Sequence, residues 1–572
     1  MNWRIRLISV LIIFSATLLL GRLYFVQIVH GKSFVSSAER QYVNKNTISY
    51  DRGEIYFQSK TGEKIPAAIS RSGFSVSINP SVMTEEEKIY ESLNAIISLD
   101  KAEFMAKTLD KADKNEEIAK RLNSETADKI KNLNLYGVSV STDKWRFYPG
   151  NDLASQSIGF VAFLENALAG RYGLERYYEE VLKRDPSKAY DNFFAEFFSS
   201  VKETWSDHPA DEGDIVTSIE PSVELFLEDE LRNIRDTWSS DGAGGVIIDP
   251  VSGEIIALAW NPSFNPNNFQ ESDISRFGNP IVEGVYEMGS IVKPLTMAAG
   301  LDSGTVSAGT TYNDEGFLVL NGKRISNYDN RGRGVVDMQE VLNQSLNTGA
   351  AYVALKMGNK KFSEYMKSFG VGTETGIDLP NEANGLINNL DSSREIEMAT
   401  ASYGQGIAFT PIATVRALSA LANGGTLITP HIVKKIEYES GLSKRLSFAP
   451  GKQVIKKETS HEISRMLVEV VDTALREGKA KIPGYSVAAK TGTAQMTEEG
   501  RPGYAEGKYL HSFFGYFPAY DPKFLVFLFH IYPKNVRYAS ETLTDPFLNI
   551  TKFLINYYQI PPDRPEEVVK AL

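Results

Sequence analysis

The stretch "YEMGSIVKPLTMAAGLDSG", residues 286–304, places a serine, a lysine and a proline at the start of an apolar segment. Proline is tolerated in a helix only in the first turn, where backbone N–H groups have no partner within the helix. Pro294 therefore predicts that Ser290 and Lys293 lie at a helix start, three positions apart and on one face. A serine nucleophile needs this arrangement, because the amine can reach the hydroxyl and free N–H groups can hold a developing oxyanion.

The Ser-x-x-Lys spacing by itself carries little information, because it recurs in the chain. The other copies lie in polar, acidic surroundings such as "SLDKAE" and "STDKWR", which favour solvated surface pairs. These copies are Ser98/Lys101, Ser141/Lys144 and Ser199/Lys202.

A second candidate element is the tripeptide Ser345-Leu346-Asn347, which falls between the helical stretches "VVDMQEVLNQ" and "TGAAYVALKMG". A connection between two helices can project both polar side chains into one cleft. Ser-x-Asn also begins at positions 77, 92 and 263, and an ordinary Ser/Asn turn is the alternative interpretation.

The third candidate element, Lys490-Thr491-Gly492-Thr493, follows the alternating strand "YSVAA". A lysine and two hydroxyls on a strand suit binding of a carboxylate, and Gly492 lets another backbone approach closely. An extended peptide could then pair along the strand edge. The alternative is an ordinary solvated lysine on an edge strand.

A second Lys-Thr-Gly copy lies in "FQSKTGEKIP", residues 57–66, between two strand-like runs. The crowding of serine, glycine and lysines in a short connection is typical of a hairpin turn, with Gly62 at positive φ. We therefore expect Lys60 to be solvated and without a role in catalysis.

The composition excludes several classes of function. The chain has 572 residues and a net charge of -11, so no basic surface for nucleic acid is expected. It contains no cysteine, and its six histidines show no ligand spacing, so neither a metal nor another cofactor is implied. The Gly-x-Gly at residues 404–406 opens no G-x-G-x-x-G unit and indicates a turn.

The hydropathy pattern predicts several segments. Residues 7–29 are apolar enough to span a bilayer as an anchor helix, with residues 1–6 as a cytoplasmic stub. A cleaved signal peptide is the alternative, but no small-x-small cleavage site follows the apolar run. Mixed strand and helix patterns over residues 30–238 precede a large α/β domain at 239–560 and a tail at 561–572.

The order Ser-x-x-Lys, Ser-x-Asn, Lys-Thr-Gly within one predicted domain is the signature of penicillin-recognising serine enzymes. Leu346 stands where class A β-lactamases have aspartate, as in penicillin-binding proteins. The chain resembles the class B penicillin-binding proteins, which are monofunctional peptidoglycan transpeptidases, over nearly its whole length. The resemblance extends to the segments "AGGVIIDPVSGEIIALAWNPSFNPN", "GQGIAFTPIATVRALSALANGG", "RFYPGNDLASQSIGF" and "GRYGLERYYEEVL". In "RGEIYFQSKTG", however, Phe57 and Gln58 stand where the family usually has aspartate and arginine.

The resemblance implies an α/β (α+β) fold, in which an antiparallel sheet flanked by helices forms the transpeptidase domain. A mixed α+β pedestal of the dimerisation type and one N-terminal transmembrane helix would precede that domain. The implied location is the bacterial plasma membrane, crossed once, with the catalytic domain outside the cytoplasm. The implied partners are peptidoglycan stem peptides, β-lactam inhibitors, membrane lipid and a SEDS-family glycan polymerase.

The resemblance also assigns roles to the motif residues. A D-Ala-D-Ala donor would acylate Ser290, Lys293 would take the serine proton, and Ser345 would relay a proton to the departing D-alanine. Asn347 would position Lys293 and the donor's amide, and the backbone N–H groups of Ser290 and Thr493 would hold the oxyanion. The expected catalytic residues are Ser290, Lys293, Ser345 and Asn347, and the expected substrate-binding residues are Lys490, Thr491, Gly492 and Thr493.

Two alternative functions use the same motifs. A D,D-carboxypeptidase or β-lactamase would use water in place of the amine acceptor, but the long pedestal and the expected anchor argue against it. A non-catalytic β-lactam sensor or scaffold would need a signalling domain, for which six residues ahead of the apolar run leave no room. The sequence leaves open whether the enzyme serves division or elongation.

Overall fold

The computed structural model describes Trp3 and residues 51–164, 167–184, 212–448, 451–497 and 503–567. The described chain divides into two compact units, one holding Trp3, Asp51 and residues 71–145, and the other residues 52–70 with everything described from residue 146 onward. Among the described residues, no helix is long and apolar enough to cross a membrane. The anchor predicted at residues 7–29 lies outside the described residues, and the predicted domain boundaries stay predictions.

The first unit is a small α+β module. Its core is formed by apolar side chains on one face of the sheet and of the helices, including Val76, Ile89, Leu93, Phe104 and Ile130. The elements are the second half of β2 (Lys64–Ile78), β3 (Glu116–Leu122), β4 (Val138–Phe147), α3 (Glu86–Asn94), α4 (Lys101–Leu109) and α5 (Ser124–Asn132). Both β3 and β4 pair with β2.

The second unit begins with the hairpin of β1 (Ile55–Gln58) and the first half of β2. Gly62 in the connecting turn has a φ of +87°, so the predicted hairpin turn is confirmed. The strand β1 also pairs in parallel with β7 (Gly213–Thr217), which is followed in the sheet by β15 (Val433–Tyr438) and β16 (Ser443–Arg445). Phe57, at the position that departs from the family pattern, is 2% exposed and packs into the main hydrophobic core.

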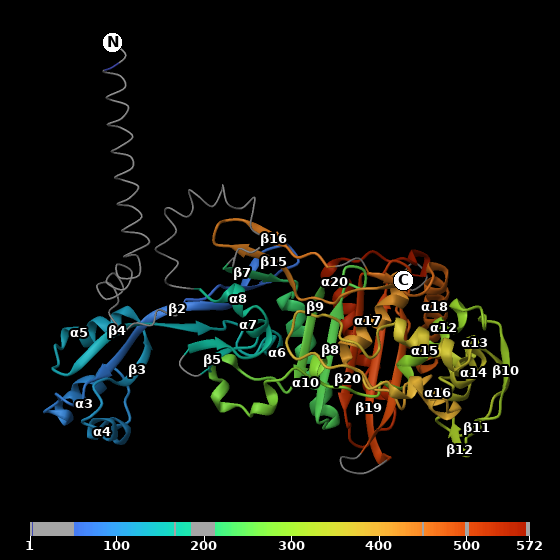
Figure 1. The fold of residues 1–572 in the computed structure, drawn as a ribbon, viewed down its shortest axis with the longest axis horizontal. Coiled ribbons are helices and arrows are strands. Elements are labelled where there is room, and N and C mark those ends of the chain that lie inside the picture. The colour runs from blue at the N-terminus through green and yellow to red at the C-terminus, as the bar shows by residue number, and fades with distance from the viewer. Residues whose placement is uncertain are drawn as a thin grey trace. The chain divides into compact units, whose positions relative to one another are not determined.

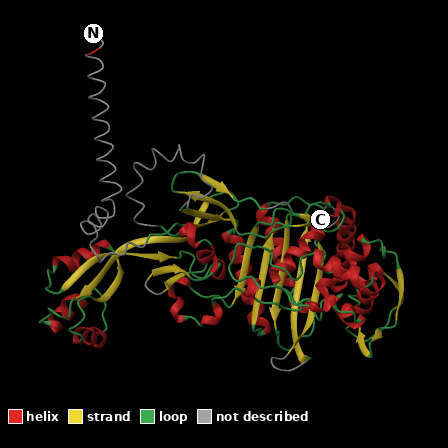
Figure 2. Ribbon diagram, in the orientation of Figure 1, coloured by secondary structure: helices red, strands yellow, loops and turns green. Residues whose placement is uncertain are grey.

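A five-stranded antiparallel sheet forms the centre of the second unit (Figures 1 and 2). Its order is β18 (Ala488–Thr497), β19 (Tyr504–Phe517), β20 (Phe524–Ile531), β8 (Gly242–Ile248) and β9 (Ile255–Asn261). Alternate side chains bury on opposite faces, because successive residues of a strand point to opposite sides. One face packs against α10 (Pro221–Trp238) and α20 (Thr544–Tyr558), and the other faces a helical layer.

The helical layer holds the nucleophile candidate and carries three small two-stranded sheets. The helices are α11 (Pro280–Glu283), α12 (Lys293–Asp302), α13 (Met338–Asn343), α14 (Asn347–Met357), α15 (Asn359–Ser368), α16 (Glu395–Ala401), α17 (Pro411–Ala422) and α18 (Lys457–Glu469). The two-stranded sheets pair β10 (Thr311–Asp314) with β13 (Gly334–Asp337), β11 (Phe317–Leu320) with β12 (Lys323–Ser326), and β14 (Thr426–Leu427) with β17 (Lys452–Gln453).

Short elements complete the second unit. They are β5 (Val161–Leu164), β6 (Ala167–Gly170), α6 (Ser155–Ile158), α7 (Gly173–Tyr177), α8 (Glu179–Leu182) and α19 (Ala539–Thr542). The mixed α/β fold with an antiparallel sheet between helices is therefore the one that the sequence predicts.

Candidate active site

The structure brings Ser290 and Lys293 together at the start of α12. Gly289–Val292 form a 3-10 turn, and α12 continues from Lys293 with Pro294 in its first turn. The Lys293 Nζ lies 2.9 Å from the Ser290 Oγ, and Lys293 is only 1% exposed. The prediction that Pro294 sets both residues at a helix start is confirmed.

Ser345 lies between two lysine amines. Lys293 Nζ donates to the Ser345 carbonyl oxygen at 2.6 Å and lies 3.0 Å from the Ser345 Oγ. Lys490 Nζ reaches the same Oγ at 3.0 Å. A neutral amine has two N–H groups and one lone pair, so directing both N–H groups of Lys293 at Ser345 turns its lone pair toward the Ser290 hydroxyl.

Burial sets the charge of the two lysines. Desolvation, followed by the charge of Lys490, holds the pKa of Lys293 well below its usual value of 10.5. Burial alone lowers the pKa of Lys490 to about 8. The shift favours the unprotonated form of the Lys293 amine, which can act as a base, whereas Lys490, with a pKa of about 8, is still mostly charged at neutral pH.

The loop that carries Ser345 is conformationally strained. Ser345 has a φ of +54°, in the left-handed region that non-glycine residues seldom adopt. Its carbonyl oxygen accepts from Lys293, and the next residue, Leu346, is fully buried and anchored through its N–H to the Val341 carbonyl. Such strain persists only where surrounding contacts hold it, which is typical of functional sites.

Asn347 begins α14 beside this loop but makes a different contact from the one expected. Its Nδ2 donates to the backbone carbonyl of Ser326 at 2.8 Å, at the end of β12, and not to Lys293. The following residue, Thr348, is buried and donates to Asp314 at 2.7 Å. In this structure Asn347 therefore fixes the Ser345 loop to a neighbouring hairpin.

The strand β18 forms one edge of the five-stranded sheet and packs directly on the Ser290 turn. A Cβ added at Gly492 would lie 2.7 Å from the Met288 carbonyl oxygen, and one at Gly289 would lie 2.8 Å from the Thr493 carbonyl oxygen. Gly289 also has a φ of +64°. The close backbone approach predicted at Gly492 is present, and its partner is the turn that carries Ser290.

The three side chains expected to share a carboxylate lie on two faces of β18. Lys490 and Gly492 face the helical layer, whereas Thr491 and Thr493 alternate with them. Thr493 Oγ1 accepts a hydrogen bond from the Ala539 N–H at 3.1 Å. The structure thus brings Lys490 to Ser345, and leaves the two threonines on the opposite face of the strand.

Sequence reasoning missed the contribution of the Gly-x-Gly turn at residues 404–406. The Gly289 N–H donates to the Gly404 carbonyl at 3.1 Å, and the Gly406 N–H donates to Glu287 Oε1 at 2.9 Å. Tyr504 OH donates to the other Glu287 oxygen at 2.9 Å. The segment is a turn, as predicted, but only the three-dimensional fold shows that it supports the nucleophile.

The other Ser-x-x-Lys copies show surface contacts where the structure describes them. Lys101 pairs with Glu87, and Lys144 lies 3.5 Å from Asp51. Lys101 is exposed and Lys144 is partly exposed. The interpretation as solvated surface pairs is confirmed for these two copies, and the third, at residues 199–202, lies outside the described residues.

The first Lys-Thr-Gly copy makes its contacts away from the Ser290 cluster. Lys60 is exposed, as expected, but it is not simply solvated. Its Nζ donates to the Tyr557 carbonyl at 2.8 Å and lies 4.1 Å from the centre of that tyrosine ring. Lys60 therefore links the β1–β2 turn to α20, a contact that its local sequence does not reveal.

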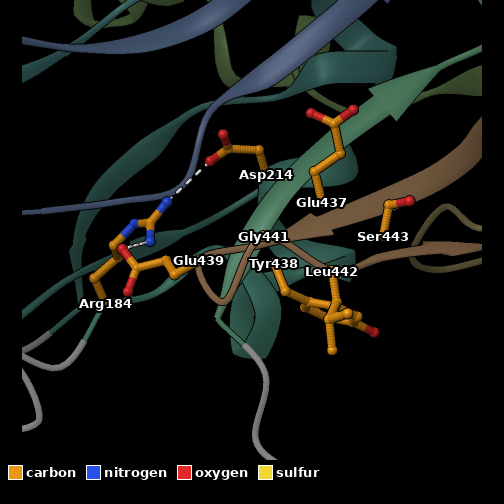
Figure 3. A pocket seen from close by; sticks show the side chains of 8 residues that line it. All are labelled: Arg184, Asp214, Glu437, Tyr438, Glu439, Gly441, Leu442 and Ser443. Atoms are coloured by element: carbon orange, nitrogen blue, oxygen red, sulfur yellow. Dashed lines mark hydrogen bonds and ion pairs between the residues drawn. The ribbon is translucent and has the colours of Figure 1, made fainter. Parts of the chain in front are cut away.

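A pocket of about 410 Å³ lies elsewhere, at the β15–β16 hairpin (Figure 3). Its one arginine, Arg184, pairs with Asp214 at 2.9 Å and with Glu439. Glu437 pairs with Lys64 at 2.7 Å. Since these charges are already neutralised within the protein, we do not assign catalysis to this pocket.

Comparisons with known proteins agree with this site. The family model described as the penicillin binding protein transpeptidase domain matches residues 243–551, and that of the penicillin-binding protein dimerisation domain matches residues 47–193. Stage V sporulation protein D of Bacillus subtilis is 32% identical over 538 residues, covering 92% of this chain and 81% of that protein. The peptidoglycan D,D-transpeptidase FtsI of Buchnera aphidicola is 27% identical over 98% of this chain and 96% of its own length.

Solved structures share the fold. Penicillin binding protein 2X from Streptococcus thermophilus has a TM-score of 0.72 at 19% identity, covering 89% of this chain and 79% of that one. Penicillin binding protein 3 from Mycobacterium tuberculosis, complexed with aztreonam, has a TM-score of 0.67 at 20% identity. The match covers 90% of this chain and 98% of that one. Fold and site together define a penicillin-recognising serine enzyme. The chain belongs to the class B penicillin-binding proteins.

Proposed function

We propose that this protein is a peptidoglycan D,D-transpeptidase that cross-links stem peptides through an acyl-enzyme on Ser290. The observation that carries the proposal is the buried Lys293 amine, placed between the Ser290 hydroxyl and Ser345. Membership of the family supports it, and relatives of this chain bear the name peptidoglycan D,D-transpeptidase.

The first step is acylation of Ser290. The Ser290 Oγ attacks the carbonyl carbon between the two terminal D-alanines of a donor stem peptide, while Lys293 accepts the hydroxyl proton. The backbone N–H groups of Ser290 and Thr493 hold the oxyanion. As the C–N bond breaks, the proton passes from Lys293 through the Ser345 hydroxyl to the departing D-alanine, which leaves as an amine.

The second step forms the cross-link. An amine of a neighbouring stem peptide attacks the acyl carbon and gives up a proton to the now neutral Lys293. The ester bond to Ser290 Oγ breaks, a new amide bond forms, and the serine recovers its proton. The free enzyme is regenerated without a cofactor.

Residues 490–493 of β18 bind the substrate in this proposal. Lys490 supplies positive charge next to Ser345 for the terminal carboxylate of the donor, and Gly492 keeps β18 close to the Ser290 turn. Thr491 and Thr493 lie on the other face of this edge strand and reach the carboxylate around its edge. β-Lactams present a similar carboxylate and a strained amide, so they acylate Ser290 and act as inhibitors. The complex of the mycobacterial penicillin-binding protein with aztreonam supports this assignment.

The location follows from the substrate and from the apolar segment. Stem peptides lie outside the plasma membrane, so we infer a single-pass protein anchored by residues 7–29, with the catalytic domain on the extracytoplasmic side. We also infer a SEDS-family glycan polymerase as a partner that supplies nascent glycan strands. The support for this partner is the family resemblance.

The hydrolase and sensor alternatives differ from this proposal in their products. A carboxypeptidase given a stem pentapeptide and an amine acceptor would release a tetrapeptide, whereas a transpeptidase forms the cross-linked amide. A sensor would be acylated by a β-lactam yet turn over neither peptide. Incubating the protein with both peptides and resolving the products by mass spectrometry separates the three outcomes.

The acylation rate should show a bell-shaped dependence on pH. Lys293 acts as a base only when unprotonated, so the rate rises with pH through the depressed pKa of Lys293. Lys490 contributes charge only when protonated, so the rate falls again above its pKa of about 8. Stopped-flow acylation with one β-lactam measures the profile, and a rate still rising at pH 10 would contradict the assigned charge states.

The two Lys-Thr-Gly copies should differ sharply under mutation. Lys490→Ala removes a charge-assisted contact worth roughly 1.5–3 kcal/mol and should slow acylation by about one to two powers of ten. Lys60→Ala should change stability by no more than about 1 kcal/mol, through the lost contact with Tyr557, and leave acylation intact. Acylation rates and melting curves of both variants test this, and equal slowing in the two would contradict it.

A further inference from the structure

Two buried histidines lie directly behind the Lys-Thr-Gly-Thr strand. His511 on β19 is paired in register with Thr493 on β18, and His530 on β20 is paired with His511. Both histidines are 0% exposed, and their ring centres lie 5.1 Å apart. The proposed mechanism assigns no role to either histidine.

Thr542 on α19 connects the two rings. Its Oγ1 lies 2.9 Å from His511 Nδ1 and 3.0 Å from His530 Nε2. The outer nitrogens are also paired, since His511 Nε2 lies 3.1 Å from the Arg537 carbonyl oxygen and His530 Nδ1 lies 2.8 Å from the Ser240 Oγ. Four hydrogen bonds thus form one continuous chain.

When both histidine rings are neutral, the four hydrogen bonds can run in only one donor-to-acceptor direction. The Arg537 carbonyl can only accept, so His511 carries its proton on Nε2 and accepts at Nδ1 from the Thr542 hydroxyl. The Thr542 oxygen then accepts from His530 Nε2–H, and His530 Nδ1 accepts from the Ser240 hydroxyl. Burial lowers the pKa of His511 to about 4 and that of His530 well below 6.5, which favours the neutral rings.

The hydrogen-bond chain ends at the segment that contacts Thr493 on β18, whose backbone N–H is proposed to hold the oxyanion. Its last acceptor, Arg537, lies two residues before Ala539, whose N–H donates to Thr493 Oγ1 at 3.1 Å. Thr542 lies on the same short helix as Ala539. The position of Thr493 is therefore tied to the buried chain both through the register with His511 and through α19.

We propose that His511, His530 and Thr542 are positioning residues that fix Thr493 for its part in acylation. Thr493 supplies a backbone N–H to the oxyanion and a hydroxyl to the substrate carboxylate, and both need fixed orientation to favour the transition state. Losing the middle of the hydrogen-bond chain would leave two buried ring nitrogens unpaired and free α19 to shift. This inference rests on the proposed function, because acylation of Ser290 is what Thr493 assists.

The test compares substitutions that differ only in the hydroxyl. Thr542→Val keeps the shape but removes the hydroxyl, and should lower the acylation rate constant for a saturating β-lactam by about tenfold. Thr542→Ser keeps the hydroxyl and should stay within about twofold of the unchanged protein. Thr551→Val is the matched control, since Thr551 is also buried and, among the residues that the structure describes, its hydroxyl bonds only the Phe547 carbonyl in α20.

The outcomes separate positioning from a purely structural role. If Thr542→Val and Thr551→Val lower the melting temperature alike but only the first slows acylation, the proposal holds. Equal acylation rates in these two variants, or no rescue by Thr542→Ser, would overturn it. Should Thr542→Val fail to fold, Ser240→Ala removes the first donor of the chain, and an unchanged acylation rate there would also overturn it. Failure of the unchanged protein to be acylated would instead reject the proposed function.

Discussion

Replacing Ser290 with alanine should abolish covalent labelling of the protein by a fluorescent penicillin. The Ser290 Oγ is the only hydroxyl that lies at the start of α12 within 2.9 Å of the Lys293 amine, among the residues that the structure describes. Without it no acyl-enzyme can form at this site, so labelling should fall to background, a loss of about three powers of ten or more. The time course of in-gel fluorescence measures this loss of labelling.

The matched control for this experiment is Ser141→Ala. Ser141 belongs to another Ser-x-x-Lys copy, and its hydroxyl lies 2.9 Å from that of Ser75. This variant should be labelled at the normal rate. Labelling that survives in Ser290→Ala, or that peptide mapping places on another serine, would show that the nucleophile is misassigned.

Lys293→Met should slow acylation by about two to four powers of ten, the usual range for loss of a general base. Methionine nearly keeps the volume of lysine and suits a buried site, so the protein should still fold. The lost function is acceptance of the Ser290 proton, together with the contacts from Nζ to the Ser345 carbonyl and hydroxyl. Acylation rate constants at several pH values measure the effect.

A matched control is Lys144→Met, which alters the lysine of a surface Ser-x-x-Lys copy. The acylation rate constant of the Lys144→Met variant should equal that of the unchanged protein at every pH. In Lys293→Met the rising limb of the pH profile should also disappear. A Lys293→Met protein that keeps this limb, or loses less than tenfold in rate, would assign the base to another group.

The central features of the site were predictable because they depend on local sequence. Pro294 limits Ser290 and Lys293 to a helix start by backbone sterics alone, and the structure places them there. The alternating pattern before Lys490 likewise predicts a strand, and β18 begins within that stretch, at Ala488, and continues through the Lys-Thr-Gly-Thr segment. Gly62 marks a turn in the same way, because positive φ is a property of one residue.

Other features depend on contacts between distant segments, which local patterns do not encode. The left-handed φ of Ser345 arises because Lys293 and buried neighbours hold its loop, and Asn347 meets the Ser326 carbonyl only once β12 has folded beside it. The pairing of His511 with Thr493 follows from strand register, which is fixed by the whole sheet. The contact between Lys60 and Tyr557 joins residues 497 positions apart.

The measurement that tests the account most directly is the mass spectrum of muropeptides made by the full-length protein. The protein would be supplied with lipid II and a SEDS-family polymerase, and the product digested with a muramidase. We expect cross-linked dimers in which one donor has lost its terminal D-alanine, and their absence when Ser290→Ala replaces the unchanged protein. Uncross-linked tetrapeptides with the unchanged protein, or dimers formed equally by Ser290→Ala, would contradict a Ser290 transpeptidase.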